Sequence, residues 1–128
     1  MRIPVLDIYF YKTEQGNEPV RQWLQELSTA DKKRLGEDIK SVQFGWPLGM
    51  PLVKHLDGDL WEVRVPLSKR IARVLFVLDG NSMVLIHGFI KKQQKILKAD
   101  LDLAKDRVKK LRGRVWRKNT LAVTLMIS

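Results

Sequence analysis

Arginine and lysine residues interrupt or close three apolar runs in the second half of the chain. Arg64 and Arg73 each lie within a run of alternating side chains, and Lys91 and Lys92 close a third run. An arginine inside an apolar strand is costly to bury unless it is paired or used. If the three runs are neighbouring strands, these side chains form one cationic patch on a rigid sheet, and such a patch suits an anionic substrate.

Cleavage of RNA by its own 2′-hydroxyl group is a reaction that suits such a patch. The reaction needs a proton acceptor for the hydroxyl, positive charge beside the phosphorane-like intermediate, and a proton donor for the leaving 5′-oxygen. Arginine binds phosphate oxygens through two-point contacts, and a lysine crowded by other cations transfers protons near neutral pH. We therefore treat Arg64, Arg73, Lys91 and Lys92 as candidate catalytic residues for RNA cleavage without a metal ion.

Glu62 lies two residues before Arg64 on the same face of an expected strand, so it is a candidate base for this reaction. The alternative is that Glu62 forms a salt bridge that holds Arg64 or Arg73 in position. Trp61 is more typical of a core residue than of a base-stacking platform. His87 is more typical of a packing residue than of a general acid or base.

The distribution of charge favours an anionic partner. Residues 1–50 contain seven basic and seven acidic residues, whereas residues 51–128 contain 17 basic and seven acidic residues, so the net charge of +10 lies in the second segment. Such asymmetry is typical of nucleic-acid-binding proteins, and a solvated surface is the alternative. The candidate RNA-binding residues are Lys54, Lys69, Arg70, Lys95, Lys109 and Lys110.

Composition argues against several other classes of protein. The chain has no cysteine, so disulfides and thiolate chemistry are excluded, and two isolated histidines are too few for a typical zinc site. No apolar run approaches the roughly 18 residues that span a bilayer. Residues 1–10 carry Asp7 in their apolar stretch, which does not fit a signal peptide. We expect a cytoplasmic protein that needs no cofactor and does not bind a membrane.

A strand and two helices are expected in the first part of the chain. Residues 3–11 are rich in strand-forming residues. From Val20 onward, apolar residues recur at intervals of three and four, which predicts a short helix. Ser28 with Asp31 resembles a capping box and opens a second helix, which Gly-Trp-Pro at 45–47 ends.

After residue 51 the spacing of apolar residues changes to two, and it becomes helical again near the end. Consecutive strands with short connections pair antiparallel. We predict an α+β fold in one domain of residues 1–113, with an antiparallel sheet and all helices, two N-terminal and one C-terminal, packed on one face. The expected strands cover 52–56, 60–65, 70–78 and 83–90, and the last helix covers about 98–112.

Three motifs in this region resemble the phage-derived, HigB-like branch of the RelE superfamily. They are Leu-Asp-Gly-Asp-Leu-Trp-Glu-Val-Arg at 56–64, Arg-Val-Leu-Phe at 73–76 and Leu-Ile-His-Gly-Phe-Ile-Lys-Lys at 85–92, and Ala-Lys-Asp-Arg follows at 104–107. The resemblance extends from about residue 5 to residue 112. The sequence departs from the family at 93–97, where Gln-Gln-Lys-Ile-Leu stands in place of the frequent Thr-Pro.

The resemblance implies a RelE-like fold and a toxin of a type II toxin–antitoxin pair that inhibits growth. Such toxins enter the ribosomal A site and cleave mRNA, and the antitoxin of this branch is usually a helix-turn-helix DNA-binding protein. The expected partners are therefore mRNA, the ribosome and such an antitoxin. By position, the implied basic cleavage residues are Arg64, Arg73 and one or both of Lys91 and Lys92.

Two other classes of function are also consistent with the sequence. A nucleic-acid-binding protein without catalysis, such as a degenerate toxin, would show the same basic and aromatic residues. A structural protein that assembles with a partner would explain the basic and then apolar extension at 114–128, which lies outside the family pattern. The sequence predicts neither the structure of this extension nor the oligomeric state.

Overall fold

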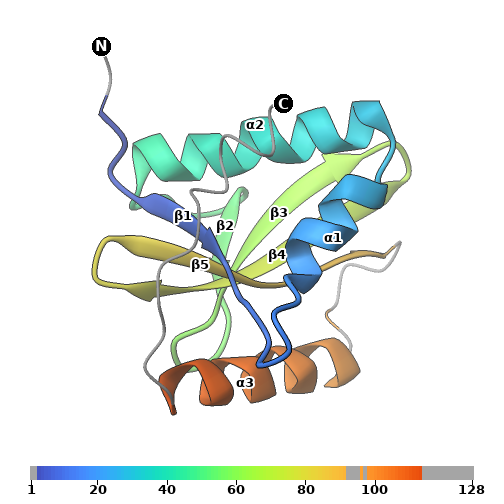
Figure 1. Cartoon of the computed structure of the whole chain (residues 1–128). Coiled ribbons are helices and arrows are strands. Elements are labelled where there is room, and N and C mark those ends of the chain that lie inside the picture. The colour runs from blue at the N-terminus through green and yellow to red at the C-terminus, as the bar shows by residue number, and fades with distance from the viewer. Residues whose placement is uncertain (1–2, 92–95, 97, 114–128) are drawn as a thin grey trace.

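The order of helices and strands is the one that the sequence predicts. The structure, a computed structural model, describes residues 3–91, 96 and 98–113, so the extension at 114–128 lies outside the described residues. Figure 1 shows its elements, which are β1 (Asp7–Phe10), α1 (Pro19–Glu26), α2 (Thr29–Gly45), β2 (Val53–His55), β3 (Trp61–Leu67), β4 (Arg70–Asp79), β5 (Ser82–Lys91) and α3 (Lys98–Arg112).

Local signals determine where several of these elements begin and end. Pro19 occupies the first turn of α1, where a missing N–H costs nothing. The side-chain oxygen of Ser28 accepts a hydrogen bond from the backbone N–H of Asp31 over 3.2 Å, so the predicted cap begins α2. Gly58 and Gly80 have φ angles of 56° and 60°, which glycine adopts without strain in the turns before β3 and before β5.

The five strands form one mixed sheet in the order β1-β5-β4-β3-β2. The strands from β2 to β5 pair antiparallel as predicted. β1 pairs parallel with β5, so the prediction of an entirely antiparallel sheet is wrong for this strand. That prediction rested on short connections, whereas β1 is separated from the other strands by two helices, and a connection of that length allows parallel pairing.

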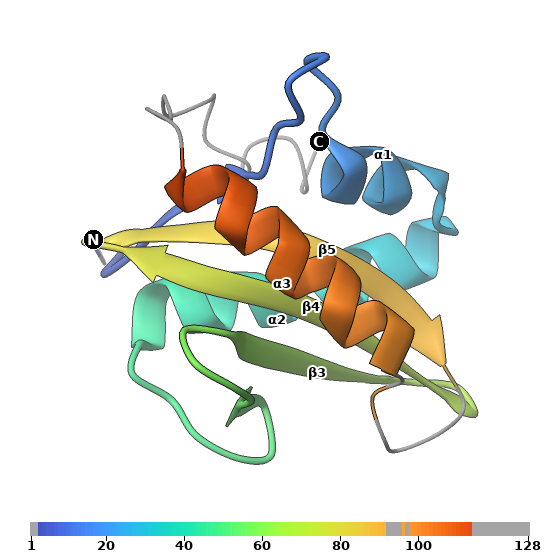
Figure 2. The same ribbon diagram turned by 90° about the horizontal axis from the view of Figure 1, so that it is seen from below.

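The helices lie on both faces of the sheet, which corrects the prediction that they share one face. Figures 1 and 2 show α1 and α2 on one side of the sheet and α3 on the other. Val20 and Ile39 belong to one hydrophobic cluster, whereas Ala104 and Leu111 of α3 belong to a second one. All six residues at 72–77 of β4 are buried, so the central strand needs cover on both faces.

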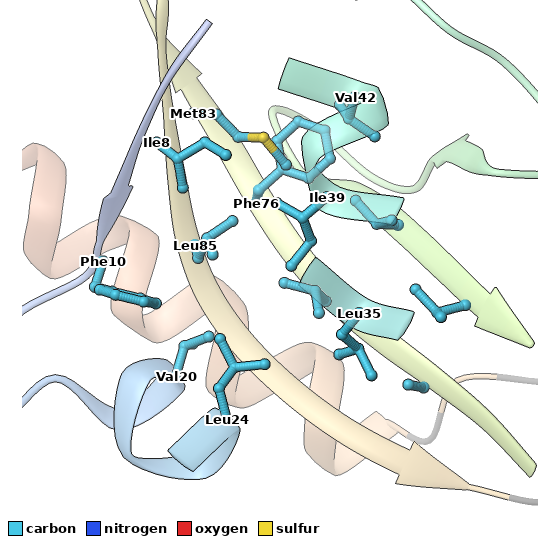
Figure 3. Packing of buried hydrophobic residues seen from close by; sticks show 14 of the residues in the cluster. Ile8, Phe10, Val20, Leu24, Leu35, Ile39, Val42, Phe76, Met83 and Leu85 are labelled. Atoms are coloured by element: carbon cyan, nitrogen blue, oxygen red, sulfur yellow. The ribbon is translucent and has the colours of Figure 1, made fainter. Parts of the chain in front are cut away.

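Close packing determines the position of α1 and α2 on the sheet. Figure 3 shows Leu35 and Ile39 of α2 directed toward the sheet, where Phe76 of β4 lies. A Cβ atom on Gly88 of β5 would lie 2.4 Å from the ring of Trp23, so only glycine leaves room for this tryptophan of α1. The central strands, which carry the site residues, are therefore tightly packed against α1 and α2.

Candidate functional site

A buried ion pair joins the two strands that carry the predicted arginines. Glu62 of β3 is 0% exposed and Arg73 of β4 is 2% exposed. The Nη1 of Arg73 donates a hydrogen bond to Oε2 of Glu62 over 2.8 Å. Arg73 shares a face of β4 with Leu75 and Val77, because these positions are two residues apart, and both belong to the cluster beneath α3. The pair therefore lies on the face of the sheet that α3 covers.

Arg64 completes this group on the same face. It lies directly opposite Arg73 in the register of β3 and β4. Its Nε is 3.5 Å from Oε1 of Glu62, so one carboxylate contacts both guanidinium groups. The side chain of Arg64 is 18% exposed, which makes it the member of the group that a bound phosphate is able to reach. We call Glu62, Arg64 and Arg73 the sheet cluster.

The burial of the sheet cluster changes the roles expected for two of its residues. Arg73 was predicted to contact phosphate, but in this structure its guanidinium is out of reach of a ligand. Glu62 forms the salt bridges of the structural alternative, and full burial separates it from a substrate hydroxyl. The sequence predicts that these residues are neighbours, and the tertiary structure determines that only Arg64 faces outward.

Lys91 lies on the same face of the sheet, at the end of β5. In the register of β4 and β5, Ile71 pairs with Lys91 and Arg73 pairs with Phe89. Residues two apart along a strand share a face, so Lys91 lies about 7 Å further along the strands than Arg73. The other predicted lysine, Lys92, lies outside the described residues.

A groove of about 550 Å³ opens beside Arg64, where a tight hairpin connects β3 and β4. It brings together Arg64 and two predicted RNA-binding residues, Lys69 and Arg70. The apolar residues of the groove were not predicted, because an apolar side chain by itself gives no sequence signal for a ligand. We call this site the hairpin groove, and its lining residues are Pro51, Arg64, Pro66, Leu67, Lys69, Arg70 and Ile71.

Arg70 anchors the hairpin to the first turn of α2. Its two terminal nitrogens donate hydrogen bonds to the carboxylate of Asp31 over 3.0 and 3.2 Å, and its Nε donates to the carbonyl of Ser68 over 3.2 Å. The hydrogen bond from Arg70 lowers the pKa of the Asp31 carboxyl group. Because these contacts occupy all three guanidinium nitrogens, Arg70 shapes the groove from within the fold.

Three other predicted RNA-binding residues that the structure describes do not line the hairpin groove, namely Lys54, Lys109 and Lys110. Lys54 is exposed on the edge strand β2, opposite Glu62 in the register. Lys109 and Lys110 are exposed near the C-terminal end of α3, and Figure 2 shows that this end lies far from the hairpin of β3 and β4. Lys95 lies outside the described residues.

Three lysines of α3 form ion pairs with aspartates. We call them the α3 ion pairs, which are Lys98–Asp102 at 2.6 Å, Lys105–Asp57 at 2.5 Å and Lys110–Asp106 at 3.1 Å. Their aspartate partners raise the pKa of Lys98 and of Lys110. Much of the positive charge that the sequence places on α3 is therefore balanced within the fold.

His87 connects β5 to the beginning of α3. Its Nε2 lies 2.9 Å from Oδ1 of Asp100, a partner that the sequence interpretation missed although an acidic residue in a first helical turn is a recognised signal. Burial lowers the pKa of the His87 imidazole, and the hydrogen bond that His87 donates to Asp100 opposes this shift. The packing interpretations of His87 and Trp61 are confirmed, and the Trp61 ring packs edge-on against Trp46 with centroids 5.0 Å apart.

Comparison with known proteins places the chain in a family. A family model described as phage derived protein Gp49-like (DUF891) matches residues 22–109, a segment that contains the sheet cluster and the hairpin groove. A search of curated proteins gave no match to the chain. Among the described residues, no helix has the length and apolar character needed to cross a membrane. With a family model covering more than half of its length, the chain belongs to the Gp49-like family of phage-derived, toxin-like proteins.

Proposed function

We propose that this protein is the toxin of a type II toxin–antitoxin pair and that it cleaves mRNA by attack of the 2′-hydroxyl group. The observation that carries the proposal is the placement of Arg64. Its side chain is partly exposed, lies beside a buried carboxylate and borders a cationic groove. Membership of a toxin-like family supports the proposal, as do the motifs that resemble the HigB-like branch.

In the proposed reaction, the 2′-oxygen forms a bond to the adjacent phosphorus and loses its proton to water, while the bond from phosphorus to the 5′-oxygen breaks. Arg64 binds the non-bridging oxygens and stabilises the additional negative charge of the transition state. Lys91 donates a proton to the leaving 5′-oxygen. The products are one RNA ending in a 2′,3′-cyclic phosphate and one beginning with a 5′-hydroxyl.

Glu62 and Arg73 act in this proposal as positioning residues. Arg73 holds one oxygen of Glu62 over 2.8 Å, and the other oxygen lies 3.5 Å from Nε of Arg64. This arrangement restrains the Arg64 side chain before the substrate arrives, and pre-organised donors lose little energy to reorientation during the reaction. The catalytic residues that touch RNA are then Arg64 and Lys91.

The partners follow from the proposed activity. A toxin-like protein calls for an antitoxin, and we propose a helix-turn-helix protein that masks the toxin in the cytoplasm, with ribosome-bound mRNA as the substrate. Induction of the chain alone should arrest bacterial growth and deplete mRNA, and co-expression of the antitoxin should restore growth. Normal growth at a confirmed level of folded protein contradicts the toxin assignment.

Single-turnover cleavage of ribosome-bound mRNA tests the role of Arg64. We expect Arg64→Ala to lower the rate by about 10²-fold, the typical effect of losing one oriented donor. Arg64→Lys should not restore the rate, because an ammonium group lacks the planar two-point geometry. The matched control is Arg34→Ala, which removes an exposed arginine from α2 on the opposite face. Equal rates for Arg64→Ala and the control contradict the proposal.

A nucleic-acid-binding protein without catalysis is the second candidate function. The burial of Glu62 and Arg73 favours this second function, because RNA does not reach two of the predicted catalytic groups. Product analysis separates the two candidates. The first requires 2′,3′-cyclic phosphate ends and loss of cleavage when the attacking nucleotide is 2′-deoxy, whereas the second requires bound RNA that stays intact.

A further inference from the structure

The hairpin groove combines positive charge with apolar surface, and none of the lining residues that the structure describes is acidic. Its cations are Arg64, Lys69 and Arg70, and the remaining lining residues are prolines, leucine and isoleucine. Pro66 is exposed and Ile71 is half-buried, so both present apolar atoms to the groove. Single-stranded nucleic acids bind to surfaces of this kind, because phosphates contact the cations while bases and riboses contact apolar groups.

Several contacts make the groove a built feature of the fold. Leu67 and Arg70 pair directly across the hairpin, and Arg70 ties the hairpin to Asp31 of α2. On the other side, the backbone N–H of Arg64 donates a hydrogen bond to the carbonyl of Leu52 over 2.8 Å. The groove therefore lies between the β3–β4 hairpin, which is held to α2, and the segment at 51–52, which is held to β3.

Lys69 is the groove residue whose charge is most available. Its side chain is exposed, and no carboxylate forms an ion pair with it among the residues that the structure describes. Arg70, by contrast, is held by Asp31, and Arg64 shares its charge with Glu62. Lys69 also has a φ of 59°, a left-handed conformation unusual for a lysine, at the tip of the hairpin.

Arg64 and Lys69 are far enough apart along the hairpin to contact two different phosphate groups. Leu67, beside the tip of the hairpin, lies three residues beyond Arg64 on β3, which is about 10 Å at about 3.4 Å per residue. We infer that the hairpin groove binds the single-stranded RNA next to the cleavage point, with Lys69 on a phosphate that neighbours the one at Arg64, and with Pro66 and Ile71 against the ribose or base between them. This inference deepens the proposed function and rests on it for the identity of the ligand.

Binding of a single-stranded 2′-O-methyl RNA, which lacks the attacking hydroxyl, tests the groove separately from cleavage. Lys69→Asn removes the charge and keeps a residue that tolerates the left-handed backbone. We expect weaker binding, and the slope of log affinity against log salt should fall by about 0.7, the value for one phosphate contact on a single strand. Lys40→Gln, which removes one exposed charge from α2 on the other face, is the control and should leave the slope unchanged.

Ile71→Thr tests the apolar part of the groove and keeps a β-branched residue in the strand. It should weaken binding of the same RNA without changing the salt slope, because the lost contact is uncharged. A duplex of the same sequence should bind less tightly than the single strand to the wild-type protein. If Lys69→Asn and Ile71→Thr both bind single-stranded RNA like the wild type, the inference is wrong.

The outcomes also separate this inference from the proposed function. A wild-type protein that cleaves RNA, with a Lys69→Asn variant that binds RNA normally, overturns the groove and keeps the nuclease. A wild-type protein that cleaves nothing, with a Lys69→Asn variant that has lost affinity and salt slope, keeps the groove and overturns the nuclease. If Lys69→Asn weakens only the binding of an acidic partner protein, the groove is a protein contact and the inference fails.

Discussion

The sheet cluster and the α3 ion pairs use the same kinds of charged side chain in opposite surroundings. Glu62 and Arg73 in the sheet cluster are 0% and 2% exposed, whereas the Lys98 and Asp102 side chains are 88% and 54% exposed. Water and salt screen an exposed pair, so it contributes little, whereas a buried pair is costly to break. Burial, and not the number of charges, therefore distinguishes a group that holds one geometry from a group that balances surface charge.

Breaking the buried pair should have the largest effect of all the changes considered. Arg73→Ala leaves Glu62 buried without its hydrogen-bond donor, so we expect the free energy of unfolding to fall by about 3–5 kcal/mol. Arg34→Ala, which breaks an exposed pair with Asp38, should change it by less than about 1 kcal/mol. Urea unfolding of the two variants measures the difference. Similar small losses in both would mean that the sheet cluster is not buried in solution.

Replacing both partners of the buried pair separates stability from function. Glu62→Leu with Arg73→Met removes both charges, and such replacements leave stability about unchanged or raise it by about 1–4 kcal/mol. Cleavage should still fall by about 10²-fold, because Arg64 loses the carboxylate that orients it. Urea unfolding and single-turnover cleavage are measured on the same preparation. A stable double variant that cleaves at the wild-type rate would assign the pair to structure alone.

The contact between the sheet and α3 should make stability depend on pH. Burial lowers the pKa of folded His87, despite Asp100 and together with the nearby charges of Arg107 and Lys91. Neutral His87 therefore contributes to the free energy of unfolding above about pH 6.5, the ordinary histidine pKa. This contribution is lost as the pH falls, because His87 binds a proton more readily in the unfolded chain than in the folded protein. The urea midpoint of the wild type should fall more than that of His87→Gln over this range. Parallel curves for both proteins contradict this assignment.

The smallest effect is expected on α3. Neutralising Lys109 and Lys110 together removes two positive charges, but Lys110 is already paired with Asp106. We expect the salt slope of RNA binding to change by less than the value of about 0.7 expected for Lys69→Asn. Titration of the 2′-O-methyl RNA at several salt concentrations compares the variants. A larger change at α3 would move the RNA-binding surface from the hairpin groove to this helix.

The sequence predicted the parts of the site that depend on local pattern. Short connections and alternation predicted that Arg64 and Arg73 lie on neighbouring strands and share a face. The register confirms this and shows in addition that the two residues are directly opposite each other. The same alternation could not show that Arg73 is buried, because burial depends on which elements cover that face of the sheet, and α3 begins only at Lys98. The roles of Lys92 and Lys95 stay predictions, since both lie outside the described residues.

By itself, the sequence determined the α+β class, the order of the elements, the Ser28 cap and the turns, because each of these depends on residues within a few positions of one another. The tertiary structure decided that β1 pairs parallel with β5, that the helices cover both faces, and which cations remain available to a ligand. Arg70 and Asp31 are 39 residues apart, yet their pairing shapes the hairpin groove. Contacts of this kind form only when the chain has folded, because burial and ion pairing depend on neighbours in space.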